Sequence, residues 1–333
     1  MKIKKSIGFV VLAMVVTGLL AGTVWTVRAY RQPIGPALAS SAADTTVKTA
    51  VQSVSSDAVT QAQTAVCDET ATWNILVLGS DADERRFEAG ADLTRVLRVD
   101  FPNKKVTIYT FTRDLWVDST GLGLTNPSID ATQLGMVFYE ARSRSAQTGQ
   151  RASMIDGASA MGKMLFKNFT LSNDHYVAMD LSQLPAVVDA IGGVSINVPA
   201  RITDPIKGIT IEPGQQVLNG NQVVAYARAD PDSDFARISR NNLLVDALRQ
   251  KLIDPTVWAK IPELFTKFSA VIATDISPEQ VNHLACLMKE VPSTSIVQTQ
   301  IKPEWTTPGP VADSLLWDKT QVLKQLKELG LIQ

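Results

Sequence analysis

The sequence predicts an α/β protein: a single three-layer α-β-α domain around a mixed central sheet, preceded by one transmembrane helix and a stalk. Two observations lead to this prediction. Stretches with the alternation of β-strands are interleaved with stretches of helical periodicity, as expected when helices cover a sheet. An uncharged apolar run stands close to the N-terminus. With 333 residues, the chain can bury one sizeable core once its termini are set aside.

Residues 6–27 form the predicted membrane segment. The run carries no charge, and at about 1.5 Å per residue it would extend about 33 Å, enough to cross the hydrocarbon core of a bilayer. Three lysines precede it, which favours a cytoplasmic N-terminus. A cleaved signal peptide is the alternative, although the run is longer than usual and no Ala-x-Ala site follows closely. The predicted organisation has four parts: a cytoplasmic N-terminus at 1–5, a single-pass anchor in the cell membrane at 6–27, an extracellular stalk at 28–70 and an extracellular domain at 71–333. Within the domain, we expect a core that bears the motifs at 73–255 and a helical segment that completes it at 256–333.

Periodicity predicts the first elements of the domain. Apolar and alternating patterns indicate three strands, at 74–80, 94–100 and 104–112. Apolar residues at spacings of three and four predict an amphipathic helix at 153–166.

The next elements resemble a β-α-β unit. It consists of a strand at 175–180, a helix capped by Ser182 and a strand at 194–198. Two further helices are expected to begin at caps, one at Asn219 and one at Asp234. The tail adds helices at 278–291 and 318–329.

The charge and the cysteines limit the classes of function. Lys plus Arg (32) nearly equals Asp plus Glu (33), so nothing indicates nucleic-acid binding. Cys67 and Cys286 lack the spacing of a zinc site. Outside the cell they could form a disulfide, and two free thiols remain the alternative. His175 and His283, the two histidines, are expected to be structural.

The densest charged stretch lies at 228–240. If Asp234 starts a helix, then Arg237 and Asn241 follow on the same face, near the helix N-terminus. Arginine forks and helix N-termini both bind phosphate, and an aspartate there can orient a hydroxyl nucleophile. A surface helix carrying Asp/Arg pairs is the alternative.

Two further candidates stand at strand ends. Arg113 follows the predicted strand 104–112, where α/β folds often bind ligands, although a strand-terminating ion pair explains it equally well. Asp81 and Asp92 flank a polar loop and could hold Mg²⁺, with a solvated loop as the alternative.

Taken in order, NILVLGSD, ADLT, TRD, DAIGGVSINVP, LNGNQVVAYAR and SDFARISR resemble the LytR-CpsA-Psr family, from about residue 73 to residue 247. The resemblance implies one membrane-anchored α/β domain. It also implies binding of a polyprenyl (pyro)phosphate carrier and transfer of teichoic acid, capsule or a similar polymer to peptidoglycan.

The resemblance also implies roles for individual residues. Asp81 and Asp92 match the acids that hold Mg²⁺, with Mn²⁺ as the alternative ion. The positions matching phosphate ligands are Arg113, Arg228, Arg237, Arg240 and Asn241, and those expected to take part in catalysis are Asp234, Arg237 and Arg113.

The chain departs from the family pattern at several positions. Thr112 replaces a proline, and Ala229 and Asp230 stand where the second arginine of an Arg-x-Arg pair is expected. Asn241 replaces a glutamine, and Ser128 replaces a lysine.

Three functions follow as hypotheses. The first is a Mg²⁺-assisted phosphotransferase that attaches a polyprenyl-linked glycopolymer to peptidoglycan. The second is a degenerate member that binds polyprenyl-phosphate lipids or regulates envelope assembly without catalysis. The third is a pyrophosphatase activity on the lipid carrier. Phosphoryl transfer needs mainly positioning and charge stabilisation, so Arg, Asp and Mg²⁺ suffice without histidine.

Overall fold

The computed structural model describes most of the chain from residue 69 onward, together with a short segment before it. The described residues are 31–33, 35–38, 69–80, 90–122, 124, 130–144, 150–205, 207–229, 234–252, 254, 257, 264, 267–268 and 272–333. The predicted membrane segment lies outside these residues. Among the helices within them, none is long and apolar enough to cross a membrane.

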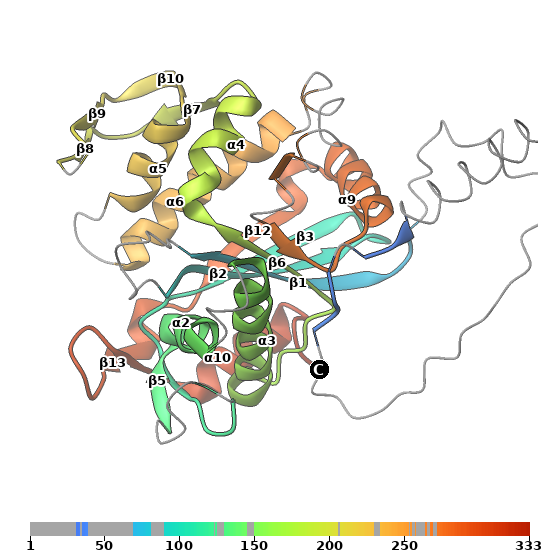
Figure 1. Cartoon of the computed structure of the whole chain (residues 1–333), viewed down its shortest axis with the longest axis vertical. Coiled ribbons are helices and arrows are strands. Elements are labelled where there is room, and N and C mark those ends of the chain that lie inside the picture. The colour runs from blue at the N-terminus through green and yellow to red at the C-terminus, as the bar shows by residue number, and fades with distance from the viewer. Residues whose placement is uncertain are drawn as a thin grey trace, which may run out of the picture.

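A six-stranded mixed sheet forms the centre of the domain (Figure 1). Its order is β11-β6-β1-β2-β3-β12. The neighbours β1/β2, β2/β3 and β6/β11 are antiparallel, while β1/β6 and β3/β12 are parallel. The strands are β1 (Thr72–Ser80), β2 (Ala91–Asp100), β3 (Lys105–Phe111), β6 (His175–Asp180), β11 (Ile272–Thr274) and β12 (Ile296–Gln300).

Helices cover both faces of this sheet, which confirms the predicted α/β class with a mixed central sheet (Figure 1). One face packs against α2 (Leu134–Arg144), α3 (Gln150–Phe169) and α10 (Lys319–Glu328). The other face packs against α6 (Asp234–Leu252) and α9 (Pro278–Glu290).

A smaller apolar cluster lies beyond α6. It is built from α4 (Leu184–Ala190), α5 (Gly220–Arg228), α6, β7 (Val194–Val198), β8 (Ile202–Asp204), β9 (Ile209–Ile211) and β10 (Gly214–Leu218). Within it β7 pairs with β10 and β8 pairs with β9. The remaining short elements are β4 (Trp116–Asp118), β5 (Ala131–Gln133), η2 (Leu181–Gln183), η3 (Ser293–Ser295), η4 (Pro303–Trp305), β13 (Thr306–Pro308) and β14 (Leu315–Trp317).

The predicted β-α-β unit is wrong in its pairing. Its second strand, β7, pairs antiparallel with β10 instead of joining the central sheet. The connection from β6 to β7, residues 181–193, is long enough for a parallel crossover, so its length does not explain the pairing. Gly192 and Gly193 then turn the chain at φ values of 82° and 78°, a conformation that favours glycine.

The predicted caps were right in one case and wrong in another. Asn219 caps α5 through a capping box with Gln222. Ser182 does not cap the next helix, because the Asp180 side chain accepts a hydrogen bond from the Ser182 N–H and caps η2 instead. The N-cap of α4, Gln183, makes no side-chain capping bond.

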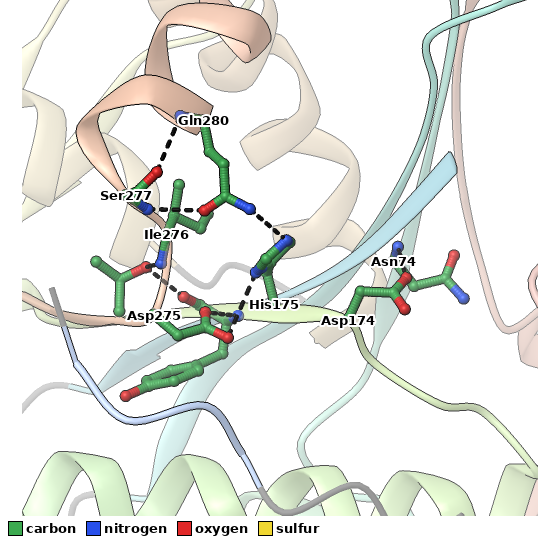
Figure 2. A network of polar contacts seen from close by, with 9 residues as sticks. Asn74, Asp174, His175, Asp275, Ile276, Ser277 and Gln280 are labelled. Atoms are coloured by element: carbon green, nitrogen blue, oxygen red, sulfur yellow. Dashed lines mark hydrogen bonds and ion pairs between the residues drawn. The ribbon is translucent and has the colours of Figure 1, made fainter. Parts of the chain in front are cut away.

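His175 belongs to a polar network that fastens β11 and the start of α9 to β6 (Figure 2). Its Nδ1 lies 3.4 Å from Asp275 Oδ2, and its Nε2 lies 3.0 Å from Gln280 Nε2. Asp275 also accepts a hydrogen bond from the Tyr176 N–H at 2.9 Å, and Gln280 closes a capping box with Ser277. These contacts tie together strands and a helix, as expected of a structural histidine.

Part of the predicted stalk contacts the domain. Leu38 packs against the main apolar core, and Arg31 forms an ion pair with Glu279 at 3.6 Å. A Cβ at Gly35 would lie 2.6 Å from the Thr274 carbonyl oxygen, so the backbone runs directly against β11. The folded region therefore includes residues before 71.

Candidate functional site

An arginine and an aspartate meet where β3 ends and β2 begins. Arg113 Nη1 lies 2.6 Å from Asp92 Oδ1, and Arg113 Nε lies 3.6 Å from Asp114 Oδ1. About 40% of the Arg113 side chain is exposed, so a ligand in solvent can reach the guanidinium. A cation flanked by two carboxylates suits a phosphate and a divalent ion side by side.

The first turn of α2 fixes the position of Arg113. The Gly135 N–H donates to the Arg113 carbonyl at 2.9 Å, and the Leu134 N–H donates to the Leu115 carbonyl at 2.7 Å. A Cβ at Gly135 would lie 3.1 Å from both Arg113 Cβ and the Ala91 carbonyl oxygen. The absence of a side chain at 135 thus lets the start of β2 and the end of β3 approach the helix together.

The loop that carries Asp81 starts from the same region. Ser80 and Ala91 are paired across β1 and β2, so the strands meet at the base of the loop. Asp81 lies outside the described residues, and its approach to Asp92 stays a prediction. Among the described residues, no group of three or more His, Cys, Asp or Glu side chains could hold a metal ion.

The other predicted ligands gather where α5 meets α6. Arg228 is the exposed last residue of α5, and Arg237 is partly exposed on α6. Arg240 Nη1 donates to the carbonyl of Ala229 and, at 3.4 Å, to that of Tyr226. Since the last carbonyls of a helix lack partners within it, Arg240 stabilises the end of α5. Its role as a phosphate ligand stays a prediction.

Two more predicted site residues lie in the first half of α6. Asp234 is the first residue of the helix, but its side chain lies outside the described part of the chain. Asn241 lies one turn after Arg237, and its Oδ1 atom is buried with no hydrogen-bond partner among the described residues. The structure therefore forms two groups: Arg113 with Asp92 at the sheet, and Arg228 with Arg240 at the α5–α6 junction.

Sequence reasoning missed Arg142. Its Nη1 donates to Ser80 Oγ at 3.0 Å, so it lies beside the last residue of β1, next to the loop of Asp81. Burial lowers the pKa of Arg142, and the nearby Asp180 carboxylate partly opposes this effect. An arginine near the end of a helix carries no motif by itself, so no sequence signal pointed to Arg142.

Arg95 was also missed. It lies in the middle of β2, with only 3% of its surface exposed. Burial lowers its pKa to about 10, although the Asp246 carboxylate acts in the opposite direction. In the sequence it stands in an alternating strand, where arginine usually indicates a face in contact with solvent.

The cysteines were predicted as a possible bridge. Cys286 lies buried on α9 and is disulfide-bonded. Cys67, the other cysteine of the chain, lies outside the described residues, so the pairing stays a prediction.

Comparison with known proteins gives a consistent picture. Residues 37–329 match the LytR_cpsA_psr family. The chain is 26% identical over 207 residues to regulatory protein MsrR of Staphylococcus aureus (strain COL), covering 61% of this chain and 56% of that protein. It is also 26% identical over 218 residues to the polyisoprenyl-teichoic acid–peptidoglycan teichoic acid transferase TagU of Enterococcus faecalis (strain ATCC 700802 / V583), covering 64% of each.

A solved structure shares the fold. The crystal structure of B. subtilis TagV superposes with a TM-score of 0.63 at 21% identity, covering 80% of this chain and 99% of that one. The alignment with MsrR spans a little over half of that relative. Because the family match extends over most of the sequence, the chain belongs to the LytR_cpsA_psr family.

Proposed function

We propose that this protein is a phosphotransferase that moves a glycopolymer from a polyprenyl-(pyro)phosphate carrier to peptidoglycan, on the extracellular side of a membrane in which residues 6–27 anchor it. The observation that carries the proposal is the pairing of Arg113 with Asp92 at 2.6 Å. It places a cation and a carboxylate side by side at one end of the sheet, which supports the proposed roles of Arg113 in phosphate binding and of Asp92 in metal binding. A family relative named as a teichoic acid transferase supports the same reaction.

The proposed chemistry relies on positioning and charge. Arg113, Arg228 and Arg237 would hold the donor phosphates, since guanidinium forks match phosphate oxygens. Asp234 would orient Arg237 or take the proton of the acceptor hydroxyl. The acceptor oxygen then forms the new phosphate ester bond while the bond to the polyprenyl phosphate breaks, and the carrier leaves as the phosphorylated lipid.

The acidic residues fit a hard divalent ion. Asp92 uses one carboxylate oxygen to bind Arg113, which leaves its second oxygen for Mg²⁺ or Mn²⁺ together with Asp81. When bound there, the ion would neutralise negative charge on the phosphate oxygens.

A second candidate function has an observation in its favour. Ala229 stands where the resemblance expects the second arginine of a pair, and its carbonyl is occupied by Arg240. Losing one charge-assisted contact costs about 1.5–3 kcal/mol. A member that binds the lipid or regulates envelope assembly without turnover would tolerate this loss. Hydrolysis of the lipid pyrophosphate, with water as acceptor, would use the same residues.

The test is donor turnover by the purified full chain in detergent. Release of the carrier from a lipid-linked glycopolymer would be followed with Mg²⁺ and then with EDTA. Arg113→Ala and Arg228→Ala should each reduce the rate at least tenfold, because each removes a charge-assisted contact. The matched control is Arg98→Ala. Arg98 is also an arginine of the central sheet, on β2, but its guanidinium lies beside Gly330, near the end of the chain.

The outcomes separate the candidates. Metal-dependent turnover that both substitutions reduce, while Arg98→Ala does not, supports the transferase. Tight lipid binding without turnover would support the binding or regulatory function instead. Turnover that is equal with water and with peptidoglycan fragments would indicate a pyrophosphatase.

A further inference from the structure

Arg95 is a buried cation whose hydrogen-bonding groups are incompletely used. Only 3% of the residue is exposed, and its Nε and Nη1 atoms have no hydrogen-bond partner within the described part of the chain. Native proteins rarely leave buried donors unpaired, and a buried charge costs far more than a neutral group. Such a group at the centre of the sheet does not stabilise the fold, so we look for a ligand that it could bind.

The surroundings of Arg95 are polar as well. Across the sheet, Arg95 is in register with Thr110, which is in register with Gln300. Thr110 Oγ1 and Gln300 Oε1 are both buried without a hydrogen-bond partner among the described residues. Arg95, Thr110 and Gln300 therefore form a row of side chains with unused polar atoms, which we call the polar row.

Helix α6 covers the polar row. Arg95 and Leu97 are two residues apart on β2 and therefore point to the same face of the sheet. Leu97 packs in the same apolar cluster as Val245 of α6, and the Asp246 charge on that helix acts on Arg95. On the same helix, Asn241 Oδ1 is buried and has no hydrogen-bond partner in the described part of the chain. Asn241 lies one turn after Arg237, so α6, the helix next to Arg95, also carries three of the predicted phosphate ligands: Arg237, Arg240 and Asn241.

Asp246 only partly offsets the charge of Arg95. Its Oδ1 accepts a hydrogen bond from Gln298 Nε2 of β12 at 2.8 Å, so part of its negative charge is already used by another partner. Despite this neighbour, two Arg95 nitrogens have no hydrogen-bond partner among the residues that the structure describes. A phosphate has several strong acceptor oxygens, and it could accept hydrogen bonds from Arg95 and from the Thr110 hydroxyl together.

We propose that Arg95 is a further substrate-binding residue, which holds a phosphate group of the lipid-linked donor between α6 and the polar row. This inference rests on the proposed function and deepens it. Arg95 would supply a cation to a chain that has Ala229 where a second arginine is expected. The same chemistry would admit inorganic phosphate, so the two sources of phosphate must be compared.

Binding to the full chain in detergent tests the proposal. The probes are a short polyprenyl monophosphate, the matching polyprenol and inorganic phosphate. Arg95→Met keeps an unbranched side chain of similar length but removes the charge. It should raise the Kd for the polyprenyl phosphate at least tenfold and leave the Kd for the polyprenol unchanged. The control, Arg98→Met, lies on the same strand beside Gly330 and should change neither.

A second substitution predicts an effect of opposite sign. Asp246→Asn removes the negative charge next to Arg95 but keeps an acceptor for Gln298. If Arg95 binds phosphate, this variant should bind the polyprenyl phosphate several-fold more tightly. If Arg95 serves only to balance Asp246, both Arg95→Met and Asp246→Asn should lower the midpoint of thermal unfolding and leave the phosphate Kd within twofold of the wild type, which would overturn the proposal.

The outcomes also separate this proposal from the transferase function. Loss of inorganic phosphate binding in Arg95→Met, in a chain without turnover, would support the Arg95 site while the transferase function fails. A wild type that turns over the donor, together with an Arg95→Met variant that binds the polyprenyl phosphate equally well, would refute the Arg95 site alone.

Discussion

Replacing Gly220 by alanine sets two physical effects against each other. Gly220 is the first residue of α5, and alanine is favoured over glycine in helices by at most about 1 kcal/mol. However, a Cβ at this position would lie 2.1 Å from the Pro185 carbonyl oxygen and 2.4 Å from Pro185 Cα. These are backbone atoms, which cannot rotate away. Helices α4 and α5 would have to separate by about 1 Å, and overpacking of this kind costs about 3 kcal/mol, the upper end of the usual range.

The net effect of Gly220→Ala should therefore be a loss of at least about 2 kcal/mol in the free energy of unfolding, since packing outweighs propensity. The midpoint of thermal unfolding should fall by about 4–8 °C for a domain of this size. The shift should also move Arg228 at the other end of α5, and displacements of about 1 Å in a site can cost about a hundredfold in rate.

Urea unfolding of the purified chain, followed by circular dichroism, measures this change. The matched control is Gly162→Ala on α3, where the nearest atom to the new Cβ would be Leu38 Cδ1 at 3.4 Å, an ordinary contact. This control should be neutral or slightly stabilising. A Gly220→Ala variant as stable as Gly162→Ala would refute the argument that the approach of α4 to α5 requires glycine.

Three further results are expected. Tyr109→Phe should lower the free energy of unfolding by about 1–3 kcal/mol, because the Tyr109 hydroxyl donates to Gln325 Oε1 at 2.7 Å and joins β3 to α10; an unchanged urea midpoint would contradict this. Peptide mapping without reductant should recover Cys67 joined to Cys286, and two alkylated thiols in exported protein would exclude the bridge. Asp92→Asn should lower donor turnover and raise the Mg²⁺ concentration needed for half-maximal rate, whereas EDTA-resistant turnover would rule out the metal.

The fold was predictable wherever the pattern was local. Strands β1, β2 and β3 and helix α3 appear where periodicity placed them, because their apolar side chains pack into the core clusters on the two faces of the sheet. The pairing of β7 was not predictable from pattern alone. Its alternation fits either sheet, and the connection before it is long enough for a parallel crossover, so the pattern does not decide between β10 and the central sheet as its neighbour.

The site was predictable in part. Arg113 was predicted from its place at a strand end, with an ion pair there as the alternative, and Asp92 was predicted separately as a metal ligand. The structure shows the ion pair, but its partner Asp92 was not predicted, because the contact depends on how closely Gly135 lets α2 approach both strands. Arg240 shows the opposite case: it was identified by its motif, but its guanidinium contacts helix carbonyls, which no sequence pattern indicates.

Arg95 shows why the sequence pattern of β2 did not predict which of its polar residues are buried. Alternating polar residues in β2 indicate a strand with one face in solvent, as in many antiparallel sheets. However, β2 lies between β1 and β3, and helices cover both faces of the sheet. A polar residue on such a strand must be paired, be neutralised or serve a ligand. Arg98 does not need such a partner, because it is only partly buried, near the end of β2 and beside Gly330. Arg95 is fully buried and does need one. If replacing Arg95 by methionine raised the stability of the protein, the fold would be retaining a destabilising residue for the sake of a function.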